Sequence, residues 1–203
     1  MKPLNALIPL FFVLIICTAT AGVCAQTGDS KKFEISGSYS YTFAPQSFET
    51  SKTPNGWAVS GAFRFAKKLA VYGEFGQDRG TDDSNGGGVT EKSTRTSALG
   101  GLRFYFAHSG RVSPFINGGL GYVSFHTKFY YASGGTAMTH LGPNLLIAGG
   151  GGFDVAVNKK GTLVWRTGAE YRHVEEGEIF SGNTFHNSSR NAFRLSTGLV
   201  LRF

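Results

Sequence analysis

The sequence predicts an all-β chain of eight antiparallel strands that close up-and-down into a transmembrane β-barrel. Three observations predict this fold. Apolar and polar residues alternate along successive segments, which is the period of a strand with two different faces. Long and short connections between these segments also alternate. The last residues, LSTGLVLRF, keep one face apolar up to Phe203, which suits a strand that closes a barrel in lipid and leaves no edge.

The first 25 residues have the features of a secretory signal peptide. Lys2 gives a positive start, an apolar run covers 7–16, and small residues precede Ala25, where we expect cleavage. A lipoprotein signal ending at Cys24 is the alternative, but Val23 stands where a small residue is preferred. Both cysteines belong to this segment, so the expected barrel domain, 26–203, contains no thiol. No apolar run after residue 25 is long enough for a membrane helix, so we expect strands to cross the membrane.

Composition narrows the function classes. The formal charge is +7, and removal of Lys2 with the signal peptide leaves +6 (7 − 1) on about 178 residues (203 − 25). These basic residues are scattered singly rather than gathered in a stripe, and the chain is expected to be exported, so we expect no nucleic-acid partner. The 29 glycines and 18 phenylalanines instead suit the crowded wall and aromatic girdles of a barrel.

The first four strands follow from the alternation in order. Residues 33–43 alternate aromatics, Ile and Gly with Glu, Ser and Thr. Residues 57–65 repeat the pattern with Trp, Val and Phe on one face, and 66–68 form a tight turn into a third strand, 69–77. After an acidic, glycine-rich stretch, residues 94–106 place Leu and Phe on one face and Arg, Ser and Tyr on the other. Each segment has the period of two that a strand requires.

The last four strands show the same alternation, broken in places by glycine. Residues 113–129 place Ile116 and Leu120 outward, and 144–157 include a run of four glycines before Phe153. A hairpin turn follows. Residues 162–174 alternate Leu, Trp and Tyr with Arg and Glu, and 192–203 form the terminal strand.

The lengths of the connections predict the orientation. The first, third, fifth and seventh connections are long, and the others are short. Outer-membrane barrels have short periplasmic turns and longer outer loops. We therefore expect the N-terminus and the turns 66–68, 107–112 and 158–161 in the periplasm. The expected outer loops are 44–56, 78–92, 130–143 and 175–191.

The charged face is expected to point inward. A soluble lipocalin-type barrel would bury its apolar face and expose its polar one. Here the strand cations are nearly all arginine, whose planar fork can bind several acceptors in a confined space, and aromatics cluster near strand ends as in membrane girdles. The predicted interior polar core consists of Glu34, Arg64, Glu74, Arg103, Asp154, Arg166, Glu170, Arg172, Arg194 and Arg202.

An eight-stranded barrel is just wide enough for side chains to fill it. Its buried charges must therefore pair. We expect Glu34 to pair with Arg202 or Arg64, and Glu74 with Arg103 or Arg64. A narrow gated ion path through these charges is the alternative to a packed core, and a wide solute pore is not expected at this strand number.

Taken together, the signal peptide, the eight alternating strands and the terminal phenylalanine resemble the small outer-membrane β-barrel family, including OmpA-like membrane domains and OmpX-like proteins. The resemblance covers residues 26–203. Its most specific part is Gly198, Leu201 and Phe203, which resemble the terminal signal read by the barrel assembly machinery, and the Gly-Gly-Leu-Gly-Tyr segment at 118–122 resembles a recurring strand sequence of the family. We find no peptidoglycan-binding domain after the barrel, so the wall-anchoring role of OmpA-like proteins is not expected to transfer.

Two function classes remain open. The first is a structural or surface-interaction barrel, with outer-membrane lipid, lipopolysaccharide or an extracellular ligand as its partner. The second is an envelope lipid-modifying enzyme, for which a deacylase-like His186 and Ser188 pair is the strongest candidate. A cluster of His173 with Glu175, Glu176 and Glu178 offers carboxylates for a divalent cation. Both are typical of solvated loops, the five histidines show no metal spacing, and we expect no catalytic, cofactor or metal residues.

Overall fold

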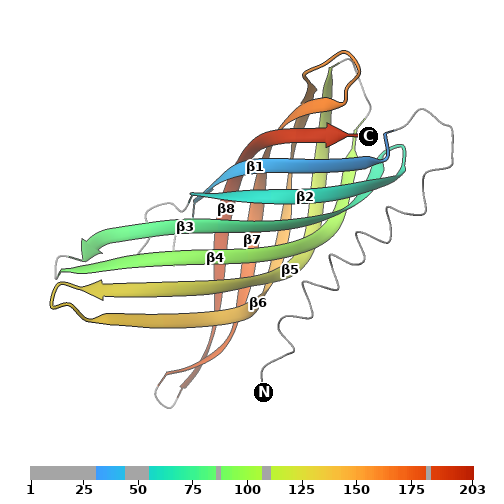
Figure 1. Cartoon of the computed structure of the whole chain (residues 1–203). Coiled ribbons are helices and arrows are strands. Elements are labelled where there is room, and N and C mark those ends of the chain that lie inside the picture. The colour runs from blue at the N-terminus through green and yellow to red at the C-terminus, as the bar shows by residue number, and fades with distance from the viewer. Residues whose placement is uncertain (1–30, 44–54, 86–87, 107–110, 182–183) are drawn as a thin grey trace, which may run out of the picture. The chain divides into compact units, whose positions relative to one another are not determined.

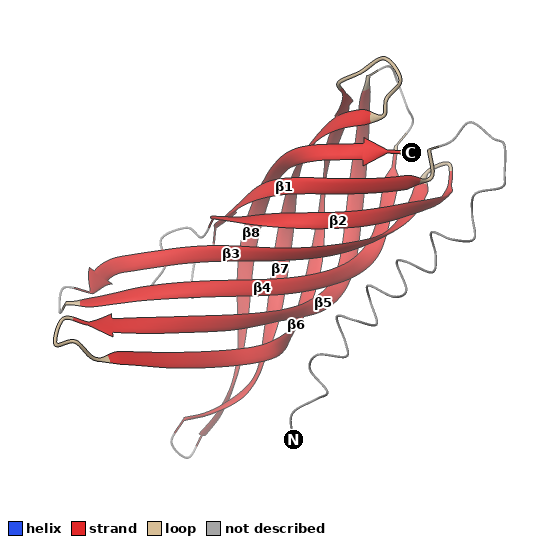
Figure 2. Ribbon diagram, viewed as in Figure 1, coloured by secondary structure: helices blue, strands red, loops and turns tan. Residues whose placement is uncertain are grey.

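A computed structural model describes residues 31–43, 55–85, 88–106, 111–181 and 184–203, without the side chains of 82–85 and 176–189. Eight strands form one closed barrel in sequence order, each antiparallel to its neighbours. Figures 1 and 2 show these strands around the barrel. Their bounds are β1 Phe33–Phe43, β2 Asn55–Ala66, β3 Leu69–Asn85, β4 Val89–Tyr105, β5 Val112–Tyr131, β6 Thr136–Ala156, β7 Leu163–Ser181 and β8 Thr184–Arg202.

The predicted all-β, eight-stranded antiparallel barrel is thereby confirmed. The predicted signal peptide, 1–25, lies outside the described residues. In the described part of the chain, no helix is long and apolar enough to span a membrane.

The barrel is staggered by ten residues. The paired residues can be followed from Phe33 around all eight strands, and the path returns to Phe43 on the same strand. Such a stagger requires strands tilted by about 35–45° from the barrel axis. Residues that pair across a ladder therefore lie at different heights along the axis, which decides which interior side chains can meet.

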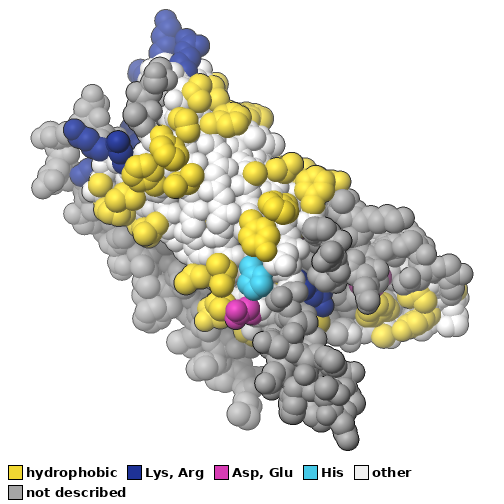
Figure 3. Space-filling view, turned by 180° about the vertical axis from the view of Figure 1, so that it is seen from behind, with side chains coloured by type: hydrophobic (Ala, Val, Ile, Leu, Met, Phe, Trp, Pro, Cys, Tyr) yellow, Lys and Arg dark blue, Asp and Glu magenta, His cyan; other side chains and the backbone are white. Residues whose placement is uncertain are grey.

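The two faces of the wall are inverted relative to a soluble protein. On β1, Ile35 is 56% exposed while its neighbour Glu34 is 3% exposed, and on β8, Leu199 is 46% exposed while Arg202 is 7% exposed. Figure 3 shows hydrophobic side chains spread over the outside of the barrel, with most of the visible lysine and arginine toward one end. An apolar outside around a charged inside is the arrangement of a barrel that faces lipid.

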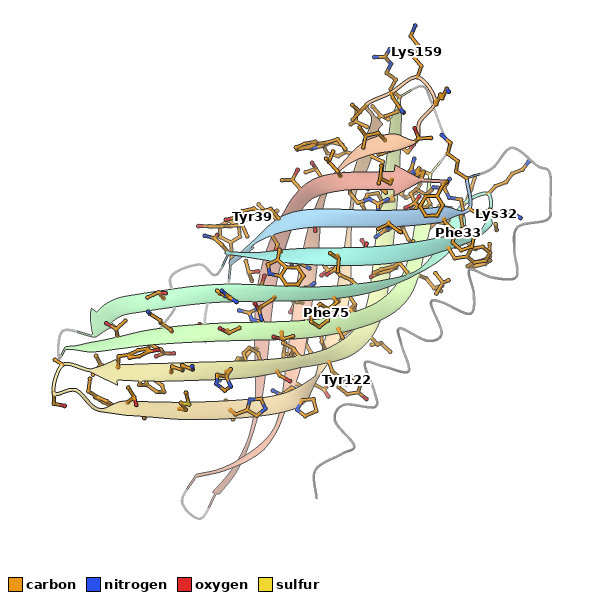
Figure 4. All side chains as sticks on the ribbon, in the orientation of Figure 1. Lys32, Phe33, Tyr39, Phe75, Tyr122 and Lys159 are labelled. Atoms are coloured by element: carbon orange, nitrogen blue, oxygen red, sulfur yellow. The ribbon has the colours of Figure 1, made fainter. Side chains whose placement is uncertain are left out.

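Aromatic side chains mark both ends of the apolar band. Figure 4 shows Phe33 and Tyr39 toward opposite ends of β1. Phe33 lies beside Phe63 and Phe203, with ring centroids 5.0 and 6.2 Å apart. Trp57 and Phe75 pack together 6.0 Å apart on β2 and β3. Aromatics at these positions are typical of the two membrane interfaces.

Three expected loops are largely strand. The expected loop 78–92 holds the ends of β3 and β4, which pair as far as Asn85 with Val89. The expected loops 130–143 and 175–191 likewise hold paired residues of β5–β6 and β7–β8. These segments are polar, and we expected loops there because a strand inside the membrane needs an apolar face. Where the strands extend beyond the membrane into water, however, both faces of the sheet can be polar. Residues 44–54 of the other expected loop lie outside the described residues.

The short connections meet at one end of the barrel, which we call the short-turn end. Lys67 and Lys68 join β2 to β3, and Asn158 lies in the turn between β6 and β7. Asn158 Oδ1 accepts hydrogen bonds from the N–H groups of Thr162 and Leu163 at 2.9 and 3.2 Å. Of the expected turn 107–112, residues 107–110 lie outside the described part.

The C-terminal residue closes the ladder between β8 and β1. The N–H of Phe203 donates to the carbonyl of Phe33, and the N–H of Phe33 donates to the carbonyl of Phe203, both at 3.0 Å. Gly198 on the same strand permits close approach, because a Cβ added there would lie 2.1 Å from the carbonyl oxygen of Gly37. Leu201 and Phe203 both project outward and are exposed.

We expect loss of Phe203 to affect assembly more than stability. Burial of one such side chain in lipid contributes only about 1.5–3 kcal/mol to the free energy of unfolding. If Phe203 belongs to the terminal signal for the barrel assembly machinery, its loss would instead hinder the insertion of each newly made chain. A chain ending at Arg202 should be degraded or accumulate in the periplasm, yet refold in detergent with a modest loss of unfolding free energy. Phe203→Tyr keeps the ring and should assemble nearly normally. Equal outer-membrane amounts of the truncated and full chains, measured by fractionation, would contradict the signal hypothesis.

Candidate functional site

The interior of the short-turn end is organised around the carboxylate of Glu34 on β1. Four arginines from four other strands lie within ion-pair distance of it: Arg64 at 2.7 Å, Arg103 at 3.6 Å, Arg166 at 2.9 Å and Arg202 at 3.0 Å. Tyr105 donates its hydroxyl hydrogen to Glu34 Oε2 at 2.9 Å. Arg64 and Arg202 are the partners that the sequence predicted for Glu34. The carboxylate thus joins β1 to β2, β4, β7 and β8.

Asp154 on β6 supplies the second carboxylate of this cluster. Arg166 binds it in a bidentate manner, through Nε at 2.7 Å and Nη2 at 2.8 Å. Arg202 also pairs with Asp154. Arg166 and Arg202 therefore each bridge both carboxylates, which the planar fork of arginine allows and the point charge of lysine would not.

Four guanidinium groups against two carboxylates leave an excess of positive charge, and aromatic faces lie against it. The guanidinium carbon of Arg64 is 4.3 Å from the ring centre of Tyr105. Arg103 lies 4.8 Å from the ring centre of Tyr72 and 5.0 Å from that of Phe115. Attraction between cation and ring is stronger where both are removed from water. These interior aromatics were not among the predicted core residues, although alternation along β3, β4 and β5 places them on the inner face.

A second cluster lies nearer the middle of the barrel. Glu74 accepts from Arg172 at 2.9 Å and from Arg194 at 2.5 Å. Glu170 accepts from Arg172 at 2.5 Å and from Asn117 at 3.2 Å. In this cluster the two carboxylates match the two guanidinium groups.

The predicted partners of Glu74 are wrong. Arg64 and Arg103 both pair in register with Ala70, four residues along β3 from Glu74 toward the short-turn end. Glu74 instead reaches Arg172 and Arg194 on β7 and β8. Sequence alternation assigns a side chain to a face, but the stagger of the sheet decides its height, and height selects the partner.

A small polar cavity separates the two clusters. Its volume is about 50 Å³, which is room for a few water molecules. Small side chains line one side, among them Ser36, Ser38, Ser60 and Ser196. Charged and aromatic side chains fill the space on the other. Among the described residues, side chains therefore fill this part of the interior around a cavity that holds only a few water molecules.

The predicted interior residues lie at inner positions of their strands. Glu34, Arg103, Asp154, Arg172, Arg194 and Arg202 are buried, and Arg64, Glu74, Arg166 and Glu170 are half-buried. Each of the ten belongs to one of the two clusters. Asn117 was missed, although it occupies an inward position of β5 where it bridges Tyr72 and Glu170.

The candidate catalytic and cation-binding residues lie toward the opposite end. The side chains of His186, Ser188, Glu176 and Glu178 lie outside the described part of the chain. His173 Nδ1 lies 2.7 Å from Asn191 Oδ1. No group of three or more His, Cys, Asp or Glu side chains converges on a metal position in the part of the chain whose side chains are described.

The comparisons with known proteins agree with this architecture. The profile of the outer membrane protein beta-barrel domain matches residues 13–203. No curated protein matches the chain significantly in sequence.

Several solved structures share the fold. Neisserial surface protein A is 16% identical with a TM-score of 0.52, over 84% of this chain and 97% of its own. Ail, the attachment invasion locus protein of Yersinia pestis, in complex with the heparin analogue sucrose octasulfate, is 18% identical with a TM-score of 0.54, over 85% and 97%. The N-terminal β-barrel domain of Pseudomonas aeruginosa OprF is 10% identical with a TM-score of 0.50, over 86% and 98%.

We expect Glu34→Gln to destabilise the barrel strongly. The substitution leaves four arginines around one remaining carboxylate, and breaking a buried ion pair by removing one partner costs about 3–5 kcal/mol. Glu175→Gln is the matched control, because Glu175 is exposed on the outer face of β7 and such substitutions usually change stability by less than about 0.5 kcal/mol. Urea unfolding in detergent measures both. An equally small loss for the two variants would show that Glu34 does not organise the interior.

Proposed function

The chain belongs to the outer membrane protein β-barrel family, and from this premise we propose that it is a surface-interaction protein of a Gram-negative outer membrane. Its interior is packed shut, and its long hairpins interact outside the cell. Residues 1–25 would direct export and be removed, and Gly198, Leu201 and Phe203 would be read by the barrel assembly machinery. In this proposal the short-turn end lies in the periplasm and the long hairpins lie outside the cell, as is general for such barrels.

The lengths of the strands carry this proposal. A strand needs about 9–11 residues to cross a membrane. β1 and β2 have 11 and 12 residues, whereas β3 to β8 have 17 to 21. Six consecutive strands therefore continue well beyond the apolar band. A barrel with a purely structural role in the membrane would not need this extension. The extension is therefore the best candidate for the surface that binds a partner.

The outer face of this extension favours lipopolysaccharide or another anionic surface as a partner. On it Lys92 of β4 pairs directly with Lys128 of β5, and Arg79 of β3 is exposed at an outward position. Like charges facing each other across a ladder are unfavourable, and an anion between them would remove that repulsion. Ail, a barrel of the same fold, was solved with a polyanionic sugar, which supports this class of partner.

Labelling of single cysteines tests the orientation. We expect Ser133→Cys, in the turn between β5 and β6, to react with a membrane-impermeant maleimide on intact cells. Lys67→Cys, in the turn between β2 and β3, should react only after the outer membrane is opened. Labelling of Lys67→Cys alone on intact cells would reverse the orientation and remove the outer surface from the proposal.

The two competing functions, a narrow ion channel and an envelope lipid-modifying enzyme, are tested on purified protein. Because ion pairs and aromatics fill the interior, we expect no large stable conductance when the barrel is inserted in planar bilayers. We also expect no release of fatty acid from lipid A. Fatty-acid release that disappears in Ser188→Ala would establish the enzyme instead. A conductance that changes in Glu74→Gln, but not in the exposed control Glu175→Gln, would establish the ion path.

A further inference from the structure

We propose that His126 of β5 and His140 of β6 form a two-histidine site for Zn²⁺ on the outside of the barrel wall. The two residues pair directly across the β5–β6 ladder. Their Nδ1 atoms lie 3.4 Å apart and their ring centres 5.6 Å apart. Both side chains are exposed. They lie fourteen residues apart in the chain, which is no metal-binding motif, so only the register of the sheet brings them together.

A bulge in β6 gives the pair its common face. Val123 pairs with Asn144 and Phe125 pairs with Leu141, so two steps along β5 match three along β6. Leu146 faces inward, and strict alternation from it would also turn His140 inward. The extra residue reverses the alternation, so Leu141 packs against the interior cluster of Val123, Phe125, Leu146 and Val174. His140 consequently faces outward beside His126.

Glycine makes this bulge possible. Gly142 has a φ of 114°, a backbone conformation that residues with a side chain rarely adopt. A Cβ added there would also lie 2.9 Å from the carbonyl oxygen of Val123. Bulges commonly re-aim a side chain next to a functional position, and here the re-aimed side chain is a histidine placed opposite another histidine.

The separation of the two nitrogens suits a shared metal better than a hydrogen bond. Hydrogen bonds in proteins are usually about 2.7–3.2 Å between donor and acceptor, and 3.4 Å is longer. Zinc binds imidazole nitrogen at about 2.0–2.1 Å in tetrahedral geometry, which sets two such nitrogens about 3.3–3.4 Å apart. The rings thus stand at the spacing of a tetrahedral chelate, with the other two positions open to water.

The neighbouring residues define which cations are accepted. The outward residues next to the pair are Thr94 on β4, Ser124 and Lys128 on β5, and Met138 on β6. Among these neighbours, whose side chains the structure describes, there is no carboxylate. Calcium and magnesium require several oxygen ligands, whereas imidazole suits zinc and related transition metals. The site therefore selects Zn²⁺ against Ca²⁺ and Mg²⁺.

Calorimetry on the untagged, full barrel refolded in detergent tests the site. We expect one Zn²⁺ per chain and no heat from Ca²⁺ or Mg²⁺. His126→Ala and His140→Ala should each weaken Zn²⁺ binding by more than the roughly 10–100-fold that loss of an outer-shell partner costs. His173→Ala is the control and should bind as the unaltered chain does, because His173 contacts Asn191 rather than another histidine.

Folding and ligand identity are checked in the same samples. Retention of the gel shift of the folded barrel shows that each variant has formed, so a lost site is not a lost fold. With Cu²⁺ as a probe, electron spin-echo spectra should show two imidazole nitrogens in the unaltered chain and one in either variant. The proposal is overturned if the unaltered chain binds no Zn²⁺, if both variants bind it equally well, or if His173→Ala alone removes it.

Discussion

The closure of β8 onto β1 is the constraint on which the rest of this structure depends. Lipid offers no partner for a backbone N–H or carbonyl group, so every strand in the membrane must pair on both sides. The reciprocal bonds between Phe33 and Phe203 complete the last ladder. With eight strands and a stagger of ten residues, closure also sets the tilt and leaves a narrow interior.

That narrow interior explains the arginine network. Outward positions must be apolar, so a charged residue on a membrane strand faces inward, where it has no bulk water. Arg166 and Arg202 each contact both Glu34 and Asp154. Two carboxylates and two arginines thereby link β1, β6, β7 and β8. In such a low-dielectric interior each ion pair is stronger than it would be in water, and removal of one partner is correspondingly costly. The same contacts that hold the wall together also occupy the described part of the interior, so the stability of the wall and the filling of that space have one cause.

Beyond the apolar band the constraint changes. Strands that leave the membrane need only pair with each other, and both of their faces can be polar. The ladders of β3–β4, β5–β6 and β7–β8 continue there. A bulge at Gly142 can therefore switch which residues of β6 face outward, because at this height a polar or charged side chain does not face lipid on either side. This freedom places His126 opposite His140 and makes the extension the part of the chain in which new surface chemistry can arise.

The sequence by itself determined the number of strands, the inward facing of the ten predicted core residues and the end at which the short turns meet, because a period of two is a local property that holds until a bulge interrupts it. It also indicated Arg64 and Arg202 as the partners of Glu34. Only the tertiary structure decided that Glu74 pairs with Arg172 and Arg194 and that β3 to β8 continue through polar segments beyond the apolar band. It also decided that His126 lies opposite His140. These depend on height along the barrel axis, which is set by the stagger and the bulge of the whole sheet and has no signature in any one segment.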